Sequence, residues 1–193
     1  MKLKACRVLP TAPIVGTWFR AVRLRHLKTA LQTSHSATTP SRYSAGLGQY
    51  EILYLGEDFA TIVYEVQAQL GSPHGTNTAS TVADNNWANI QVEVRLSTVV
   101  DLCDASVQRR LGTTTQELTG NWDGYHFRGD GPAPTHKLGS ELFNCGSIEG
   151  FISYSARVPT KKVLIVFPQR LLNSSHLLFS YHDGKRPVTH RIP

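Results

Sequence analysis

One short segment of the sequence gathers most of the residues that could carry out chemistry. Arg42 and Tyr43 precede an apolar stretch at 52–55 that contains Tyr54, and the predicted helix after it carries Glu65. Glu65 lies off the apolar stripe of that helix, so packing in a core does not explain it. It is either a solvent-exposed residue on the flank of the helix or part of a site. The neighbouring arginine and tyrosines favour the site.

A second arginine stands inside an apolar segment. Residues 17–22 predict a strand, and Arg20 interrupts it. Such a residue either faces solvent at a sheet edge or points into a cleft, where a guanidinium can bind phosphate oxygens through two donors. The sequence leaves both interpretations open.

The elements that would position these residues are a strand and a helix. The strand at 52–55 ends at Gly56, and Asp58 is expected to cap the helix that follows. Gly71 and Pro73 are expected to end that helix. Its apolar stripe, expected to face the core, consists of Phe59, Ile62, Val63, Val66 and Leu70.

The rest of the chain predicts an α+β fold with one mixed sheet. Further strands are expected at 90–96, 150–157, 162–167 and 177–181, with 162–167 apolar enough to be central. Helices are expected at 24–31, at 104–111 and from Thr135, as a cap, to Phe143. Irregular structure is expected at 1–16, 32–40, 72–89 and 113–135, and the last of these is long enough to be a lid or a binding loop. No repeat or domain boundary is visible, so residues 1–193 are expected to form a single domain.

Composition indicates an ordinary soluble domain. Of the 193 residues, 40% are hydrophobic and 18% are charged, and the three cysteines are too scattered to suggest a disulfide framework. No apolar run reaches the length of a membrane span, and Arg7, Pro10 and Pro13 interrupt any signal-peptide core. We therefore expect a cytoplasmic protein with reduced thiols and no membrane partner.

The formal net charge of +6 would suit a nucleic-acid partner, but the pattern of the charges does not. Apart from residues 20–28 the basic residues are scattered, and no helix-turn-helix, zinc-finger or RNP pattern accompanies them. An anionic small molecule or an acidic protein fits as well, so we expect no direct nucleic-acid binding. The histidines show no metal-ligand spacing, so no metal is expected, and His136 and His182 are predicted to lie at the surface or in loops.

Five segments, in order, resemble the RES domain family, which is named for arginine, glutamate and serine residues. They are 18–22 (WFRAV), 41–44 (SRYS), 52–56 (ILYLG), 63–65 (VYE) and 150–157 (GFISYSAR). The resemblance covers about residues 16–168. Many relatives carry Gly-Gly-Arg-Trp-Asn where this chain has Pro-Ser-Arg-Tyr-Ser at 40–44, so the shape of that loop and the role of Ser44 differ from the common pattern.

This resemblance implies a fold similar to that of ADP-ribosyltransferases and an activity that destroys NAD. RES proteins are typically toxins of bacterial toxin–antitoxin pairs that break the nicotinamide–ribose bond, with phosphate or water as acceptor. Their partner is usually an Xre-like helix-turn-helix antitoxin, and a homodimer is also allowed. Two alternatives stay open, a protein ADP-ribosyltransferase that uses the same site and a non-catalytic binding module.

The resemblance also assigns roles to the arginines and the glutamate. Cleavage of the bond passes through a state with positive charge on the ribose, which the carboxylate of Glu65 can stabilise. Arg20 and Arg42 can bind the pyrophosphate and fix the ribose geometry. The positive net charge of the chain would assist recruitment of the anionic cofactor.

Hydroxyl side chains complete the predicted site. Tyr43 and Tyr54 can stack on a ring or donate a hydrogen bond to a hydroxyl, or they can simply belong to the core. Ser155 is predicted to contribute a hydroxyl to phosphate or ribose. The predicted catalytic residues are therefore Glu65, Arg42 and Ser155, and the predicted NAD-binding residues are Arg20, Arg42, Tyr43 and Tyr54.

Overall fold

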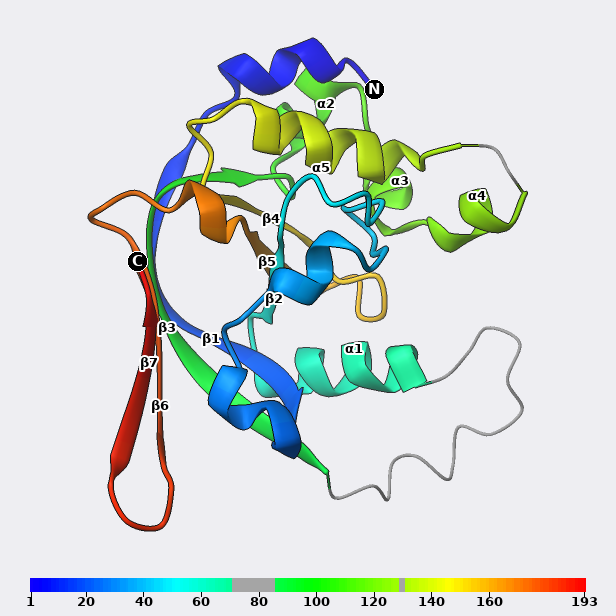
Figure 1. The fold of residues 1–193 in the computed structure, drawn as a ribbon. Helices are drawn as coiled ribbons and strands as arrows, with labels where there is room; N and C mark the ends of the chain where they lie inside the picture. The colour runs from blue at the N-terminus through cyan, green and yellow to red at the C-terminus, as the bar shows by residue number, and fades with distance from the viewer. Residues whose placement is uncertain (71–85, 129–130) are drawn as a thin grey trace.

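Seven strands in the described part of the chain form one mixed sheet (Figure 1). The computed structural model describes residues 1–70, 86–128 and 131–193, without the side chains of 66–70 and 126–128. The strand order is β1-β2-β5-β4-β3-β6-β7, with β3 and β4 parallel and the other pairs antiparallel. The strands are β1 (Ala12–Arg23), β2 (Leu53–Gly56), β3 (Trp87–Asp101), β4 (Gly150–Tyr154), β5 (Lys162–Val166), β6 (His176–His182) and β7 (Pro187–Ile192).

Helices connect and cover the strands. The α-helices are α1 (Phe59–Leu70), α2 (Ala105–Leu111), α3 (Thr115–Thr119), α4 (Asp123–Arg128) and α5 (Pro134–Asn144). Short 3-10 helices are η1 (Leu3–Val8), η2 (Leu24–Thr29), η3 (Ser34–Ala37) and η4 (Pro168–Arg170). Within the described residues, none of these helices is long and apolar enough to cross a membrane.

The sheet curls back on itself because β1 pairs with two partners. It runs antiparallel to β3 over most of its length and meets β2 at the pair Phe19–Gly56. Along β3, alternate residues are buried, as the sequence predicts for 90–96, although the strand extends well beyond that range. The buried side chains of β1, β2 and β3 meet on one face, which we call the η2 face because Ala30 and Leu31, after η2, cover it; its residues include Trp18, Val22, Leu53, Leu55 and Ile90.

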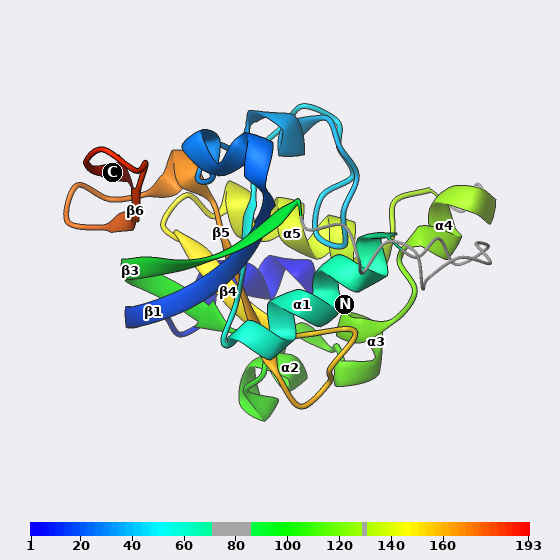
Figure 2. The same ribbon diagram turned by 90° about the horizontal axis from the view of Figure 1, so that it is seen from below.

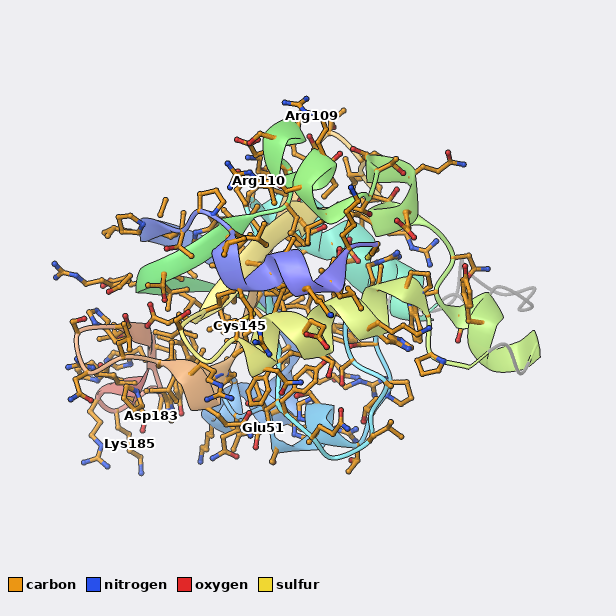
Figure 3. The ribbon with its side chains drawn as sticks, turned by 90° about the horizontal axis from the view of Figure 1, so that it is seen from above. Glu51, Arg109, Arg110, Cys145, Asp183 and Lys185 are labelled. Atoms are coloured by element: carbon orange, nitrogen blue, oxygen red, sulfur yellow. The ribbon has the colours of Figure 1, made fainter. Side chains whose placement is uncertain are left out.

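The other face of the sheet, which we call the α5 face, packs against helices. Its core contains Tyr43, Phe151 and Ile165 together with Leu138 and Leu142 of α5. Figure 3 shows η1 lying along α5, whose C-cap is Cys145. The two faces alternate along β2, because Leu53 and Leu55 belong to the η2 face while Tyr54 packs on the α5 face.

Helix α1 begins as the sequence predicts. An Asp58 Oδ1 atom accepts the N–H of Thr61 at 2.8 Å, which confirms the predicted cap. Gly56 allows the helix to approach the strand, because a Cβ there would collide with Ile62. The predicted apolar stripe is wrong at Phe59, whose side chain is 53% exposed. The side chains of Val66 and Leu70, and the predicted helix end at Gly71 and Pro73, lie outside the described residues.

Several other predictions are confirmed. Strand β5 is central, between β2 and β4, and the three cysteines are free. The predicted helix at 104–111 is present as α2; the structure adds that Asp104 caps it and that Gly112 ends it in the left-handed conformation at φ 61°. The predicted helix at 24–31 is present as the 3-10 helix η2, and the predicted strand at 150–157 ends early, at Tyr154.

The predictions of irregular structure were mostly wrong. Residues 1–16 contain η1 and the start of β1, and residues 34–37 form η3. Of the predicted connection at 72–89, residues 87–89 belong to β3, while 72–85 lie outside the described residues. The predicted loop at 113–135 contains α3 and α4, which are too short for a periodic apolar pattern to reveal them. Thr135 is not a cap, since α5 begins at Pro134 after Ala133, and the last strand is β7, whose residues alternate between exposed and half-buried.

Candidate active site

A tight turn presents Arg42 at the edge of the α5 face. The backbones of Ser41 and Ser44 bond to each other on either side of it, with N···O distances of 2.8 and 3.2 Å. The Tyr54 hydroxyl accepts the Tyr43 N–H at 3.2 Å and lies 3.3 Å from the Ser41 hydroxyl. Side-chain contacts from β2 therefore hold the turn that carries Arg42.

Tyr43, next to Arg42, points into the core. Its side chain is fully buried, its hydroxyl lies 2.6 Å from the Ser153 hydroxyl, and its ring meets Phe151 edge-on at 4.9 Å. Burial raises the pKa of the Tyr43 hydroxyl. The Tyr50 hydroxyl donates to the Tyr43 carbonyl at 2.6 Å, and a Cβ at Gly139 of α5 would collide with that carbonyl. Of the two roles considered for Tyr43, its surroundings favour core packing.

The Arg42 guanidinium bridges the turn to the end of α3. One terminal nitrogen donates to the carbonyls of Gly120 at 2.6 Å and Leu118 at 3.3 Å. None of the hydrogen bonds made among the described residues uses its Nε or its other terminal nitrogen. These groups are donors in a planar fork, the geometry that binds phosphate or carboxylate oxygens.

Glu65, on α1, is oriented by Ser155, which directly follows β4. The fully buried Ser155 hydroxyl donates to Glu65 Oε1 at 2.5 Å and accepts the N–H groups of Arg157 at 3.2 Å and Val158 at 3.0 Å. The loop after β4 lies beside α1 in both views of the ribbon (Figures 1 and 2). With its proton donated and its lone pairs occupied, Ser155 fixes the carboxylate of a half-buried Glu65.

Tyr54 connects the two halves of this arrangement. Burial raises the pKa of its hydroxyl to about 12, the negative charge of Glu65 adds to the rise, and the positive charge of Arg42 opposes it. Both charges therefore act on one phenol group. We call Arg42, Tyr54, Glu65 and Ser155 the Arg42–Glu65 cluster.

Arg20 is not part of this cluster. Arg20 and Phe19 are neighbours on β1, so their side chains point to opposite faces of the sheet. Phe19 pairs with Gly56 of β2, whereas Arg20 pairs with Ile90 of β3, whose side chain belongs to the η2 face. Burial lowers the pKa of the Arg20 guanidinium to about 10, and its buried Nε has no hydrogen-bond partner among the described residues. An anion-binding role for Arg20 stays a separate prediction, because the sheet separates it from Tyr54.

Several residues that support the cluster could not be identified from the sequence. His136, predicted to lie at the surface or in a loop, is buried in α5, and its Nε2 lies 2.8 Å from the Ser41 carbonyl. Ser153 reaches the core because it alternates with the buried Ile152 along β4. The carbonyls that bind Arg42 carry no sequence signal at all. His182 is exposed, as predicted, and no group of three or more potential metal ligands is present among the residues that the structure describes.

The fold and the cluster define a mixed-sheet α+β protein with a carboxylate and a guanidinium beside one tyrosine. The family model of the RES domain matches residues 17–181, and the chain belongs to this family. This confirms the resemblance found in the five sequence segments.

A solved structure supports the fold independently. The chain is similar to a chain in the crystal structure of the M. tuberculosis MbcT–MbcA toxin–antitoxin complex, with a TM-score of 0.66 and 14% identity over 97% of this chain and 91% of that one. The predicted fold class, a single α+β domain with one mixed sheet, is thereby confirmed. Among curated proteins, none matches this chain.

Proposed function

We propose that this protein is the toxin of a bacterial toxin–antitoxin pair and that it degrades NAD by cleaving the nicotinamide–ribose bond. Family membership supports the first part, and a toxin–antitoxin complex is the context of the similar solved structure. The observation that carries the second part is the carboxylate of Glu65, held by the buried Ser155 at 2.5 Å and close to Tyr54 and Arg42.

In this proposal Glu65 acts on the ribose. Loss of nicotinamide leaves positive charge on the sugar ring, and a fixed carboxylate stabilises that charge without having to reorganise. Ser155 is a positioning residue, because its hydroxyl is engaged by Glu65 and by two backbone N–H groups. The acceptor is phosphate or water, and no metal ion is required.

Arg42 binds the pyrophosphate through the donors that Gly120 and Leu118 do not occupy. Because these carbonyls fix the guanidinium before substrate arrives, little ordering is needed on binding. Tyr54 contributes a protonated hydroxyl between the two charged groups. Tyr43 supports the site from the core, and Arg20 on the η2 face is left out of the catalytic step.

The proposal includes an antitoxin that blocks the site in the cytoplasm, of the Xre-like helix-turn-helix type. Formation of a homodimer stays a prediction. Both are tested by purifying the protein with and without a co-expressed helix-turn-helix protein encoded beside it and measuring the mass of each complex in solution.

The direct test is incubation of the purified protein with NAD, with and without phosphate, and identification of the products. We expect release of nicotinamide without any protein substrate, and faster consumption if phosphate is the acceptor. The Glu65→Gln variant should lose this activity and should no longer inhibit growth on expression. NAD consumption only in the presence of a protein acceptor would replace the proposal with protein ADP-ribosylation, and toxicity that survives the substitution would overturn catalysis by Glu65.

A further inference from the structure

A pocket is lined by residues in or beside α3, α4 and the start of α5. Figure 1 shows these helices at one end of the molecule. The volume of the pocket is about 250 Å³, and its walls include Glu117, Gly120, Trp122, Tyr125 and Thr135. The Gly120 carbonyl that accepts from Arg42 belongs to this wall. The pocket and the Arg42–Glu65 cluster are therefore neighbours that share one backbone segment.

One side chain of the wall lacks a partner. Thr135, in the first turn of α5, is 2% exposed, and its hydroxyl oxygen forms no hydrogen bond within the described part of the chain. A buried hydroxyl without a partner is costly and uncommon in folded proteins. Because Thr135 lines the pocket, an occupant of the pocket can supply the missing hydrogen bond.

The other walls indicate a flat, neutral ring with hydrogen-bonding edges. Trp122 and Tyr125 are half-buried aromatic residues that offer faces for stacking. Trp122 is itself supported by the His136 ring at 5.4 Å. Glu117 supplies carboxylate oxygens, one of which accepts from Thr113 at 2.8 Å. Its negative charge disfavours a phosphate group here and favours an amino group that donates hydrogen bonds.

The position of the pocket relates it to the proposed substrate. The Tyr54 hydroxyl bonds to the turn that carries Arg42, and the Gly120 carbonyl joins Arg42 to the pocket. In NAD the order of groups is ribose, pyrophosphate, second ribose and adenine. With Glu65 at the nicotinamide ribose and Arg42 at the pyrophosphate, the pocket coincides with the adenine end.

We propose that this pocket is a purine subsite, in which Trp122 stacks on the adenine of the dinucleotide, Glu117 accepts from its amino group and Thr135 bonds to its edge. This inference rests on the proposed function for the identity of the dinucleotide, but not for the binding of the base. It predicts recognition of an adenine nucleotide even when no bond is cleaved.

Binding of AMP to the full-length protein, measured by calorimetry, tests the subsite without catalysis. Base–aromatic stacking is typically strong enough that Trp122→Ala should weaken AMP binding about tenfold or more. Trp87→Ala is the matched control, because Trp87 lies at the start of β3 beneath Arg23 and lines no part of the pocket. IMP, which has an oxygen in place of the amino group, should bind about tenfold more weakly than AMP, because Glu117 would then face an acceptor.

Kinetics separates the subsite from the chemical step. Trp122→Ala should raise the KM for NAD about tenfold with kcat unchanged, and should not alter turnover of nicotinamide mononucleotide, which lacks the adenylate. Thr135→Val removes only the unpaired hydroxyl and should also weaken AMP binding. This variant tests the subsite independently if Trp122→Ala does not fold.

The outcomes are distinguishable. Equal AMP affinity in the wild type and in both pocket variants overturns the subsite, whether or not NAD is consumed. If AMP binding depends on Trp122 but the protein does not cleave NAD, the subsite is supported and the proposed NAD cleavage is refuted. IMP and AMP binding equally would overturn the role given to Glu117, and with it the preference for adenine.

Discussion

The coupling between Ser155 and Glu65 gives the sharpest prediction. Ser155→Ala removes the donor at 2.5 Å from Glu65 Oε1 and the acceptor of two backbone N–H groups. A hydrogen bond to a charged group contributes about 1.5–3 kcal/mol. If this contribution acts in full to orient the carboxylate in the transition state, kcat falls about 10-fold to 100-fold, since about 1.4 kcal/mol is a factor of ten.

A double-mutant cycle on NAD consumption measures this coupling. The rates of the wild type, Ser155→Ala, Glu65→Gln and the double variant are compared under saturating NAD. Because Ser155 is proposed to act only through Glu65, the double variant should be no slower than Glu65→Gln alone. Independent, additive losses would refute the reasoning, since they would mean that the serine hydroxyl touches the substrate itself.

Stability must be followed in the same variants. The Arg157 and Val158 N–H groups lose their acceptor in Ser155→Ala, which should lower the free energy of unfolding by about 1–3 kcal/mol. Ser180→Ala is a suitable control, because the Ser180 hydroxyl is exposed and lies 2.9 Å from the Thr189 hydroxyl on the β6–β7 hairpin. It should change neither the rate nor the melting temperature.

Three further predictions concern Arg42, Gly139 beside the Tyr43 carbonyl, and Glu149, which directly precedes β4. Arg42→Lys should reduce kcat/KM for NAD about tenfold or more with little change in melting temperature, because an ammonium cannot bind Gly120 and a diphosphate in one planar fork; unchanged kinetics would contradict this. Gly139→Ala should lower the free energy of unfolding by about 1–3 kcal/mol in a denaturant titration, because the new Cβ meets the Tyr43 carbonyl, while Ser140→Ala should not. Burial alone would raise the pKa of Glu149, but backbone N–H donors, including that of Leu172 at 2.9 Å, lower it. The stability that Glu149 contributes is therefore present above its ordinary pKa of about 4.3 and is lost as the pH falls through the lower folded value, so thermal melts of Glu149→Gln should show a weaker acid dependence than the wild type.

The sequence identified the chemical groups of the site better than their spatial relations. Arg42, Tyr54, Glu65 and Ser155 come together in the structure, and family motifs at five positions were enough to select them. Arg20 was grouped with them because it lies in one of the five resembling segments, residues 18–22, and because a guanidinium can bind phosphate. Only the register of β1 against β2 reveals that it faces the other side of the sheet, and no local pattern encodes that register.

Fold predictions succeeded where one periodic pattern or one cap dominates a segment. The alternation along β3, the Asp58 cap and the central β5 all follow from residue type and local spacing. The short helices α3 and α4 failed this test, because segments of five or six residues are too brief for a helical stripe. The contribution of α3 depends on tertiary contacts, such as the carbonyls that its C-terminal end presents to Arg42.

Tyr54 explains why two charged groups from separate elements can share one small site. Its raised pKa, about 12, keeps the phenol protonated at neutral pH, so it cannot act as a base. The Tyr54 oxygen accepts the Tyr43 N–H and thereby holds the turn that carries Arg42. The Tyr54 proton remains available for donation to the Ser41 hydroxyl or to a ligand. Departing nicotinamide needs no proton, because the cationic ring leaves as a neutral molecule. A site built from a fixed carboxylate, a fixed guanidinium and a neutral phenol donor therefore suits bond cleavage driven by charge stabilisation, and in such a site the positions of Glu65 and Arg42 matter more than any proton transfer.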